Sequence, residues 1–297
     1  MDQANRLRDI VKQRELAARK EGNSAGRPAT SRVITVTSGK GGVGKSNFTL
    51  NLAIQMRKLD QRVILVDADL GLSNIEVLAG IIPRYSFADV LSGRMRIEEA
   101  LTEGPLGLKF LSGGAGLTNL AQLGEKQINT VVTAFGALDE LSDIILIDTG
   151  AGISRSVLNF ILASTETILV ATPEPTSVAD AYAMIKSLRR EANASHAIKI
   201  VTNMAATITE GQDIYEKLSK VSEQFLGVKL EQLGTLPQDS IVPRAVKRQE
   251  PFMLSYPNSE CAKAIEKIAY KLLNIEPAKA ASLSGIASFI KRLAKGF

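Results

Sequence analysis

The stretch that most constrains the fold runs from Val33 to Ser46, where a β-branched apolar run ends in GKGGVGKS. This spacing is typical of a phosphate-binding loop between a strand and a helix, because glycines let successive backbone N–H groups point into one concavity. The helix that follows directs its positive dipole end at the same anion. Lys45 is placed to reach the β and γ phosphates of a nucleotide, and the Ser46 hydroxyl to ligate Mg²⁺. The residues predicted to bind nucleotide here are Gly39, Lys40, Gly41, Gly42, Val43, Gly44, Lys45, Ser46 and Asn47.

Two later apolar strands lead to acidic residues. The run at 62–66 is followed by Asp67 and Asp69, and the strand predicted at 143–148 ends in Asp148. Parallel strands bring their carboxyl ends to one edge of a sheet, where open α/β folds bind ligands, so we expect these acids near the loop. The alternation of strands and helices predicts a doubly wound, mainly parallel α/β sheet flanked by helices. Capping of the next helix is the structural alternative for Asp67 and Asp69.

Composition and charge narrow the class of protein. A chain of 297 residues is long enough for one α/β domain with tails. The single cysteine, Cys261, excludes an internal disulfide and cannot by itself ligate an iron–sulfur cluster. Without an apolar run of about 18 residues, and with a charged N-terminus, we expect neither a membrane span nor a signal peptide.

The basic side chains gather at the two ends of the chain. Residues 1–30 hold seven basic and four acidic side chains, and residues 277–297 hold four basic and no acidic ones. The remainder of the chain is close to neutral, although the whole chain carries a formal net charge of +5. This distribution argues against nucleic acid as a partner of the body of the protein.

A second lysine in the loop, Lys40, directly follows its first glycine. In this feature the chain resembles the MinD and ParA class of P-loop ATPases with a "deviant" Walker A motif. The resemblance implies ATP or ADP and Mg²⁺ as ligands, a homodimer in the ATP state, and a Lys40 that reaches the partner's nucleotide. It also implies that Asp69 positions and polarises the attacking water, as a carboxylate can. Lys40, Lys45 and Asp69 are therefore the predicted catalytic residues of a slow, dimer-dependent ATPase.

The same resemblance assigns the metal site and a switch loop. Ser46 would ligate Mg²⁺, with Asp148 holding the ion through water and Asp67 supporting its water shell. The segment from Asp148 to Gly152, DTGAG, resembles switch II, whose glycines let the loop respond to the γ-phosphate. Most relatives carry proline at the position of Gly150, so the chain departs from the pattern there while keeping the acid.

Three later residues are assigned by the resemblance to the adenine base. Asn203 ends an apolar strand, and its amide can both donate and accept hydrogen bonds. Pro237 and Gln238 lie in GTLPQD at 234–239, which in this class is a loop that packs around the base. Ordinary capping and turn roles are the alternative for these residues.

Residues 1–21 are predicted to form a helix, and the Gly-rich segment 22–31 a flexible linker. The opening Asp2-Gln3-Ala4 resembles the N-terminal motif of the FlhG family, also called YlxH or FleN, MinD-like ATPases that regulate flagellar number and placement. In that family the motif stimulates the GTPase FlhF, and components of the flagellar basal body (C-ring) are expected as further partners. A disordered tail is the alternative. The predicted partner-binding residues are Asp2, Gln3, Ala4 and Leu7.

A second linker at 276–282 precedes a predicted amphipathic helix at 283–297. Five large apolar side chains recur there at spacings of 3, 4, 3 and 4, and fall within an arc of about 80° on a helical wheel, with the cations opposite. Such a helix satisfies the physics of an interfacial membrane anchor, and it resembles the membrane-targeting helix of MinD-type proteins. A last helix packed on the core is the alternative. The predicted membrane residues are Leu283, Ile286, Phe289, Ile290, Leu293, Phe297, Lys291, Arg292 and Lys295.

Residues 32–275 are thus predicted to form a MinD-like ATPase domain that controls flagellar number and placement. ATP-dependent dimerisation would drive binding of a cytoplasmic protein to the inner face of the cell membrane, and hydrolysis would return it to the monomer. Two alternatives remain: a MinD- or ParA-type ATPase that positions another cargo, and a scaffold that binds nucleotide without hydrolysing it. His196 and Cys261 are expected to be structural.

Overall fold

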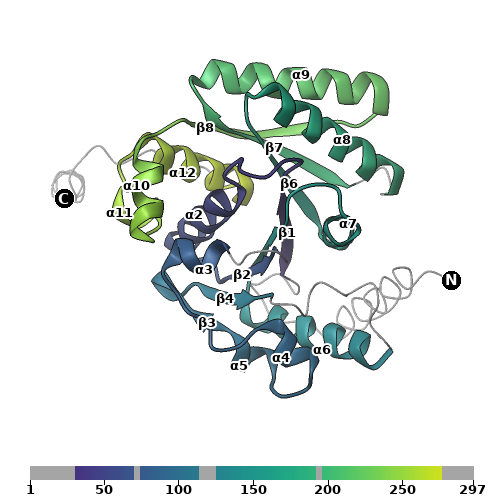
Figure 1. The fold of residues 1–297 in the computed structure, drawn as a ribbon, viewed down its shortest axis with the longest axis vertical. Helices are drawn as coiled ribbons and strands as arrows, with labels where there is room; N and C mark the ends of the chain where they lie inside the picture. Colours follow the sequence, from purple (N-terminus) through teal and green to yellow (C-terminus); the bar gives the residue numbers. More distant parts are fainter. Residues whose placement is uncertain (1–30, 70–73, 114–124, 192–195, 276–297) are drawn as a thin grey trace, which may run out of the picture.

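The computed structural model of the chain describes residues 31–69, 74–113, 125–191 and 196–275. Within these ranges the strands form one eight-stranded sheet in the order β3-β4-β2-β5-β1-β6-β7-β8 (Figure 1). Neighbouring strands run parallel except β3 and β4. This arrangement confirms the predicted doubly wound, mainly parallel α/β fold. The strands are β1 (Arg32–Thr37), β2 (Val63–Ala68), β3 (Thr102–Glu103), β4 (Lys109–Ser112), β5 (Ile144–Thr149), β6 (Glu166–Ala171), β7 (Ala197–Ala205) and β8 (Leu230–Pro237).

Helices cover both faces of the sheet, and each face has its own apolar core. One face packs against α2 (Lys45–Lys58), α3 (Asn74–Ala79), α10 (Ile241–Arg248), α11 (Phe252–Ser255) and α12 (Glu260–Leu273). The other face packs against α4 (Phe87–Leu91), α5 (Ile97–Ala100), α6 (Glu125–Leu141) and, beyond them, α7 (Arg155–Ala163), α8 (Pro175–Glu191) and α9 (Ile208–Leu226). A short 3₁₀ turn, η1 (Pro105–Gly107), precedes β4.

The central strands explain the unbroken apolar runs of the sequence. Every residue of β2 and of β5 is buried, because helices lie on both faces. Leu65 contributes to the core beneath α2, and its neighbour Val66 to the opposite core. Parallel pairing of the two strands sets Asp67 opposite Asp148. The two acidic side chains therefore enter the same edge of the sheet in adjacent positions.

Two predicted boundaries were wrong. β2 continues through Asp67 and Ala68, so Asp67 belongs to the strand and not to the loop that follows it. The segment 234–239 was expected to be a loop, but its residues 234–237 form the end of β8. The reason is that these residues continue the pairing with β7, where Gly234 lies opposite Val201. α12 covers the strand closely at this point, since a Cβ atom added to Gly234 would lie 2.5 Å from Cγ1 of Ile268. Glycine at this position lets the helix pack directly on the strand.

Several predicted segments lie outside the described residues. These are the helix at 1–21, the linker at 22–31 apart from Ser31, the second linker at 276–282 and the helix at 283–297. The partner-binding and membrane residues assigned to them stay predictions. In the part of the chain that the structure describes, no helix combines the length and the apolar character needed to cross a bilayer.

Candidate functional site

The loop between β1 and α2 adopts a conformation that only its glycine spacing permits. Gly42 and Gly44 both have φ of 80°, in the left-handed region. Gly44 is doubly constrained, because a Cβ atom there would also overlap the side-chain nitrogen of Asn203. That nitrogen, Nδ2, donates a hydrogen bond to the Val43 carbonyl oxygen at 2.8 Å. The side chain of Asn203, predicted to contact the base, thus supports the loop from β7.

A buried ion pair joins the loop to the central strand β5. Nζ of Lys45 lies 2.9 Å from Oδ1 of Asp148, and the two side chains are only 6% and 0% exposed. Thr49 donates a further hydrogen bond to the same oxygen at 3.0 Å, and Lys45 donates to Oγ of Ser46 at 3.3 Å. Burial raises the pKa of Asp148, while Lys45 and the hydroxyls of Ser46 and Thr49 oppose that effect.

The second oxygen of Asp148 provides the test of whether a cation fits here. Oδ2 is buried and accepts no hydrogen bond from the described residues, an arrangement that carries a cost unless a donor or a cation satisfies it. Ser46, at the start of α2, adds a hydroxyl oxygen beside Lys45. Hydroxyl and carboxylate oxygens are the ligands that Mg²⁺ prefers, with phosphate and water completing its shell. The described residues contain no cluster of three or more His, Cys, Asp or Glu able to hold a metal alone.

Asp67 braces the start of the next loop. It is 2% exposed, and its two oxygens accept hydrogen bonds from the backbone N–H of Asp69 at 3.0 Å and of Ile75 at 3.3 Å. Burial and, second, the nearby charge of Asp148 raise the pKa of Asp67 to about 7, although the two backbone donors and Lys45 act in the opposite direction. Asp67 is therefore hydrogen-bonded both to Asp69, directly after β2, and to Ile75 in the first turn of α3.

The loop lysine Lys40 has a different environment from Lys45. Its Nζ donates to Oε2 of Glu174 at 2.7 Å and to Oγ1 of Thr176 at 3.0 Å, at the beginning of α8. The Lys40 and Glu174 side chains are 39% and 65% exposed. An exposed pair of this kind contributes about 0–1 kcal/mol, so it can be exchanged for another anion at little cost. In this structure the amine of Lys40 faces its own chain.

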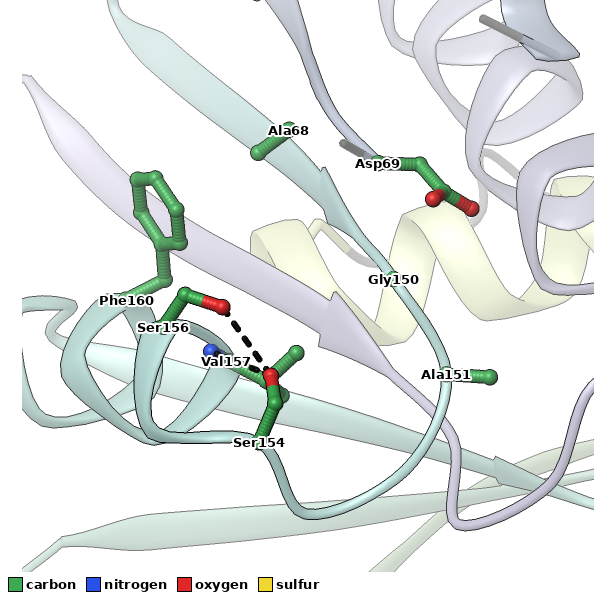
Figure 2. A pocket seen from close by; sticks show the side chains of 8 residues that line it. All are labelled: Ala68, Asp69, Gly150, Ala151, Ser154, Ser156, Val157 and Phe160. Carbon is green, nitrogen blue, oxygen red and sulfur yellow. Dashed lines mark hydrogen bonds between the residues drawn. The ribbon is translucent and has the colours of Figure 1, made fainter. Parts of the chain in front are cut away.

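Asp69 and the segment after β5 line a small pocket of about 200 Å³ that is open to solvent on one side. Figure 2 shows Asp69 beside Gly150 on one side and the hydroxyls of Ser154 and Ser156, 2.9 Å apart, on the other. A Cβ atom on Gly150 would lie 3.5 Å from Oδ1 of Asp69, which is ordinary van der Waals contact. The departure from proline at this position therefore leaves room around the Asp69 carboxyl group. The pocket is lined by Ala68, Asp69, Gly150, Ala151, Ser154, Ser156, Val157 and Phe160.

The residues assigned to the base come from the ends of β7 and β8. Gln238 donates its backbone N–H to Ala205 at 2.8 Å, which ties the two strand ends together. Cys261 donates its thiol to the Pro237 carbonyl oxygen at 3.1 Å. Its burial as part of the core agrees with the structural role expected for it. His196, also expected to be structural, shares a hydrogen bond of 2.7 Å with Thr167 at the opposite ends of the strands.

Sequence reasoning missed several residues that complete this arrangement. Thr49 was not selected, although it lies one helical turn after Lys45 and on the same face of α2. Glu174 and Thr176 had no local signal, because their contact with Lys40 joins segments more than 130 positions apart. Met204, which is 42% exposed next to Asn203 and has a φ of 57°, was also missed.

Known proteins resemble this chain over most of its length. A profile of the ParA family, described as NUBPL iron-transfer P-loop NTPase, matches residues 29–273. The antiactivator FleN of Pseudomonas aeruginosa is 38% identical over 262 residues, which cover 88% of this chain and 93% of FleN. The flagellum site-determining protein YlxH of Helicobacter pylori is 34% identical over 269 residues, covering 89% and 90% of the two chains. A chain of the MinC:MinD cell division protein complex of Aquifex aeolicus has a TM-score of 0.68 and 27% identity, covering 84% of this chain and 98% of its own length.

The buried ion pair predicts that loss of one partner destabilises the protein far more than loss of both. Asp148→Asn leaves the buried Lys45 ammonium without its ion-pair partner, so the free energy of unfolding of the nucleotide-free protein should fall by about 3–5 kcal/mol. The double variant Lys45→Met/Asp148→Asn should recover most of that loss at pH 5, where the neighbouring Asp67 is protonated and no buried charge remains. Urea denaturation measures both. The control Lys263→Ala, which removes an exposed pair with Glu260, should leave the free energy of unfolding close to that of the wild type, because solvent screens such a pair. An equal loss in Asp148→Asn and the control would contradict the prediction.

The raised pKa of Asp67 predicts how the free energy of unfolding changes with pH. The pKa of about 7 in the folded protein exceeds the ordinary value of 3.8, so the folded state binds this proton more tightly than the unfolded chain. Ionisation of Asp67 therefore costs stability progressively as the pH rises from about 4 through about 7. Between pH 5 and pH 8, in protein freed of metal and nucleotide, the wild type should lose about 2–3 kcal/mol more than Asp67→Asn. Denaturation curves that shift in parallel for the two proteins would show that Asp67 is ionised at both pH values.

Proposed function

This chain belongs to the ParA family of P-loop NTPases, and from that premise we propose that it is a MinD-like ATPase that controls flagellar number and placement. The observation that carries the proposal is a phosphate loop with two lysines, one buried against Asp148 and one exposed against Glu174. The likeness to FleN and YlxH over most of each chain supports the flagellar role. The single cysteine speaks against the transfer of an iron cluster held by thiolates.

The nucleotide would bind with its phosphates in the loop and its Mg²⁺ between Ser46 and Asp148. Lys45 would turn from Asp148 to the β and γ phosphates, exchanging one anionic partner for another without being exposed to water. The loop backbone and the first turn of α2 would supply N–H donors to the same phosphates. Mg²⁺, when bound, supplies positive charge that stabilises the transferred phosphoryl group.

Base recognition would follow from the fixed orientation of one amide. A carbonyl oxygen only accepts hydrogen bonds, so the contact with Val43 commits Nδ2 of Asn203 as the donor. Its Oδ1 is then the atom available to accept a hydrogen bond from the exocyclic amine of adenine. Guanine presents a carbonyl oxygen at that position, which would face Oδ1 unfavourably.

Lys40 would serve a second copy of the chain. Its exposed pair with Glu174 is weak enough to be exchanged for the phosphates of a nucleotide bound to that copy. Two chains facing each other across their loops would then each complete the other's site. This supports a homodimer in the ATP state that returns to monomers when the γ-phosphate has been released.

Hydrolysis would depend on Asp69. Its backbone N–H is held by Asp67 and its carboxyl group lies beside Gly150, so it stands between the two loops that follow β2 and β5. A carboxylate there would accept a hydrogen bond from the attacking water and orient it. Because Asn74 donates to Oδ2 of Asp69 at 3.4 Å, the helix that follows also orients this carboxyl group.

The two ends of the chain would connect nucleotide state to location and partners. Residues 1–21 would stimulate the GTPase FlhF, and residues 283–297 would bind an anionic membrane surface at the inner face of the cell membrane. One amphipathic helix binds a bilayer marginally, whereas two held together in a dimer gain from effective concentration. ATP-driven dimerisation would thus recruit the protein to the membrane, where components of the flagellar C-ring are the expected partners.

Turnover and mass measured on the same samples test this proposal. With Mg-ATP the wild type should hydrolyse slowly, and Asp69→Ala should lower kcat by at least about 100-fold while still binding ATP. Light scattering should then show Asp69→Ala as a dimer, and Lys40→Ala as a monomer. The control Lys229→Ala, on the exposed surface before β8, should behave as wild type. A wild type that dimerises without turnover would instead be a non-hydrolysing scaffold, and one that turns over as a monomer would contradict the role of Lys40.

The orientation of Asn203 predicts nucleotide selectivity. The wild type should bind ATP at least about tenfold more tightly than GTP. With GTP, the hydrogen bond from the adenine amine to Oδ1 of Asn203 is lost, and the guanine carbonyl oxygen faces Oδ1 instead. Asn203→Asp removes the donor to Val43 and should weaken binding of both nucleotides by a similar factor. Met204→Leu keeps an apolar side chain beside Asn203 and is the matched control. Titration with fluorescent ATP and GTP analogues gives the dissociation constants. Equal affinities in the wild type would show that Oδ1 of Asn203 does not select adenine.

A further inference from the structure

Exposed apolar and basic side chains gather on one flank of the molecule, at α3, the turn after it, and α10. Ile82 is 91% exposed and Val77 is 55% exposed, although both are large apolar residues. The two segments meet directly, because the Gln249 carbonyl oxygen lies 3.0 Å from where a Cβ atom on Gly80 would be. We call this surface the flank patch, and its members are Val77, Ile82, Arg84, Tyr85, Arg244, Val246, Lys247 and Arg248.

The α10 helix presents its cations outward because its apolar side is used by the core. Ala245 is 2% exposed, and Ile241 and Val242 pack against the core beneath α2. Arg244, Lys247 and Arg248 are exposed on the remaining side of this short helix. Arg84 adds a fourth cation from the turn after α3, and the acidic residues in or next to these segments are Glu76, Asp239 and the exposed Glu250. The flank patch therefore carries a net positive charge beside exposed apolar groups.

The shape of the flank patch favours a bilayer over a folded partner. A residue that is 91% exposed stands out from the surface and does not lie in a groove. Pro83 follows Ile82 and restricts the backbone of this turn, and Tyr85 is 44% exposed beside it. A protruding aliphatic side chain flanked by an arginine and a tyrosine matches the composition of segments that lie at the level of lipid headgroups. Anionic headgroups would complement the four cations.

The position of the flank patch agrees with that of the chain's predicted anchor. α12 belongs to the same helical layer as α3 and α10 (Figure 1), and the described chain ends just after it at Ile275. Residues 276–282 are predicted to form a linker, and a flexible chain of that length spans about 15 Å. A helix at 283–297 can therefore lie on the same bilayer as the flank patch.

We propose that the flank patch is a second contact with anionic phospholipid, made by the folded domain itself. The inference rests on the membrane association proposed above and extends it from the C-terminal segment to α3 and α10. Two contacts on one chain bind cooperatively, because the first fixes the second close to the surface. They also fix the orientation of the domain, which a single tethered helix leaves free.

Flotation with vesicles tests the proposal on the full-length chain with Mg-ATP. The patch variant is Ile82→Ser/Lys247→Glu/Arg248→Glu, and the probe is vesicles with 30% phosphatidylglycerol in phosphatidylcholine. The matched control is Lys217→Glu/Lys220→Glu/Val221→Ser, which makes the same kind of change on the exposed side of α9, in the layer on the opposite face of the sheet. A third variant, Ile286→Glu/Ile290→Glu, tests the predicted C-terminal helix. ATP binding, measured in parallel, verifies that each variant is folded.

We expect the patch variant to lose at least about tenfold in partitioning to the anionic vesicles, because it replaces two cations by carboxylates and removes one apolar contact. The control should stay within about twofold of the wild type. The inference would be overturned if the patch variant and the control variant both bind the vesicles as the wild type does. That outcome is also the one expected if the flank patch binds an acidic protein and not lipid. If the C-terminal variant then loses binding, the proposed membrane association stands without the patch. A wild type that does not bind these vesicles overturns both.

Discussion

The buried pair of Lys45 and Asp148 is the interaction on which the site depends. It joins the helix that begins with the phosphate loop to the central strand of the sheet, through two side chains that are almost completely removed from water. Two charges can be buried in this way only when each compensates the other, and Thr49 adds a further hydrogen bond to the same oxygen. The loop therefore has a defined position relative to β5 because an electrostatic penalty would follow any separation.

The parallel sheet adds a second constraint at the same edge. Its register places Asp67 beside Asp148, so two buried carboxyl groups are neighbours. Lys45 is the positive charge that acts on both of them. Burial and the neighbouring Asp148 disfavour the ionised form of Asp67 and so raise its pKa. The two backbone N–H groups that donate hydrogen bonds to Asp67 oppose this increase. One of these donors belongs to Asp69 itself, and the other to Ile75 in α3. The charge arrangement at the strand ends and the position of the proposed catalytic carboxylate are thus parts of one network.

The two lysines of the loop lie five positions apart, but one is buried and the other exposed, and this difference suits them to different roles. Lys45 is fixed by burial, and its removal would leave a charge stranded in the interior. Lys40 pairs with Glu174 at the surface, where solvent screens the interaction and exchange with another anion costs little. A fixed lysine suits the nucleotide of its own chain, and an exchangeable one suits an anion that arrives with a second copy.

The sequence by itself determined the fold class and the identity of the phosphate loop, because both are written in local patterns. An apolar run, a spaced set of glycines and a Lys-Ser pair lie within a few residues of one another, and buried parallel strands read as continuous apolar segments. The strand ends at Asp67 and Asp148 could also be found, since the acids directly follow or end such runs. Element boundaries could not be predicted as well: Gly234 and Pro237 were expected in a loop, whereas pairing with β7 extends β8 through both of them.

Only the tertiary structure decided which side chains meet. Lys45 and Asp148 are 103 positions apart, Lys40 and Glu174 are 134 apart, and Asn203 reaches Val43 across 160 positions. No local pattern records such distances, because they follow from the order of strands in the sheet and from how each helix packs on it. The orientation of the Asn203 amide, the raised pKa of Asp67 and the exposure of Ile82 have the same origin. Each depends on what surrounds a side chain in space, and the sequence states only what precedes and follows it.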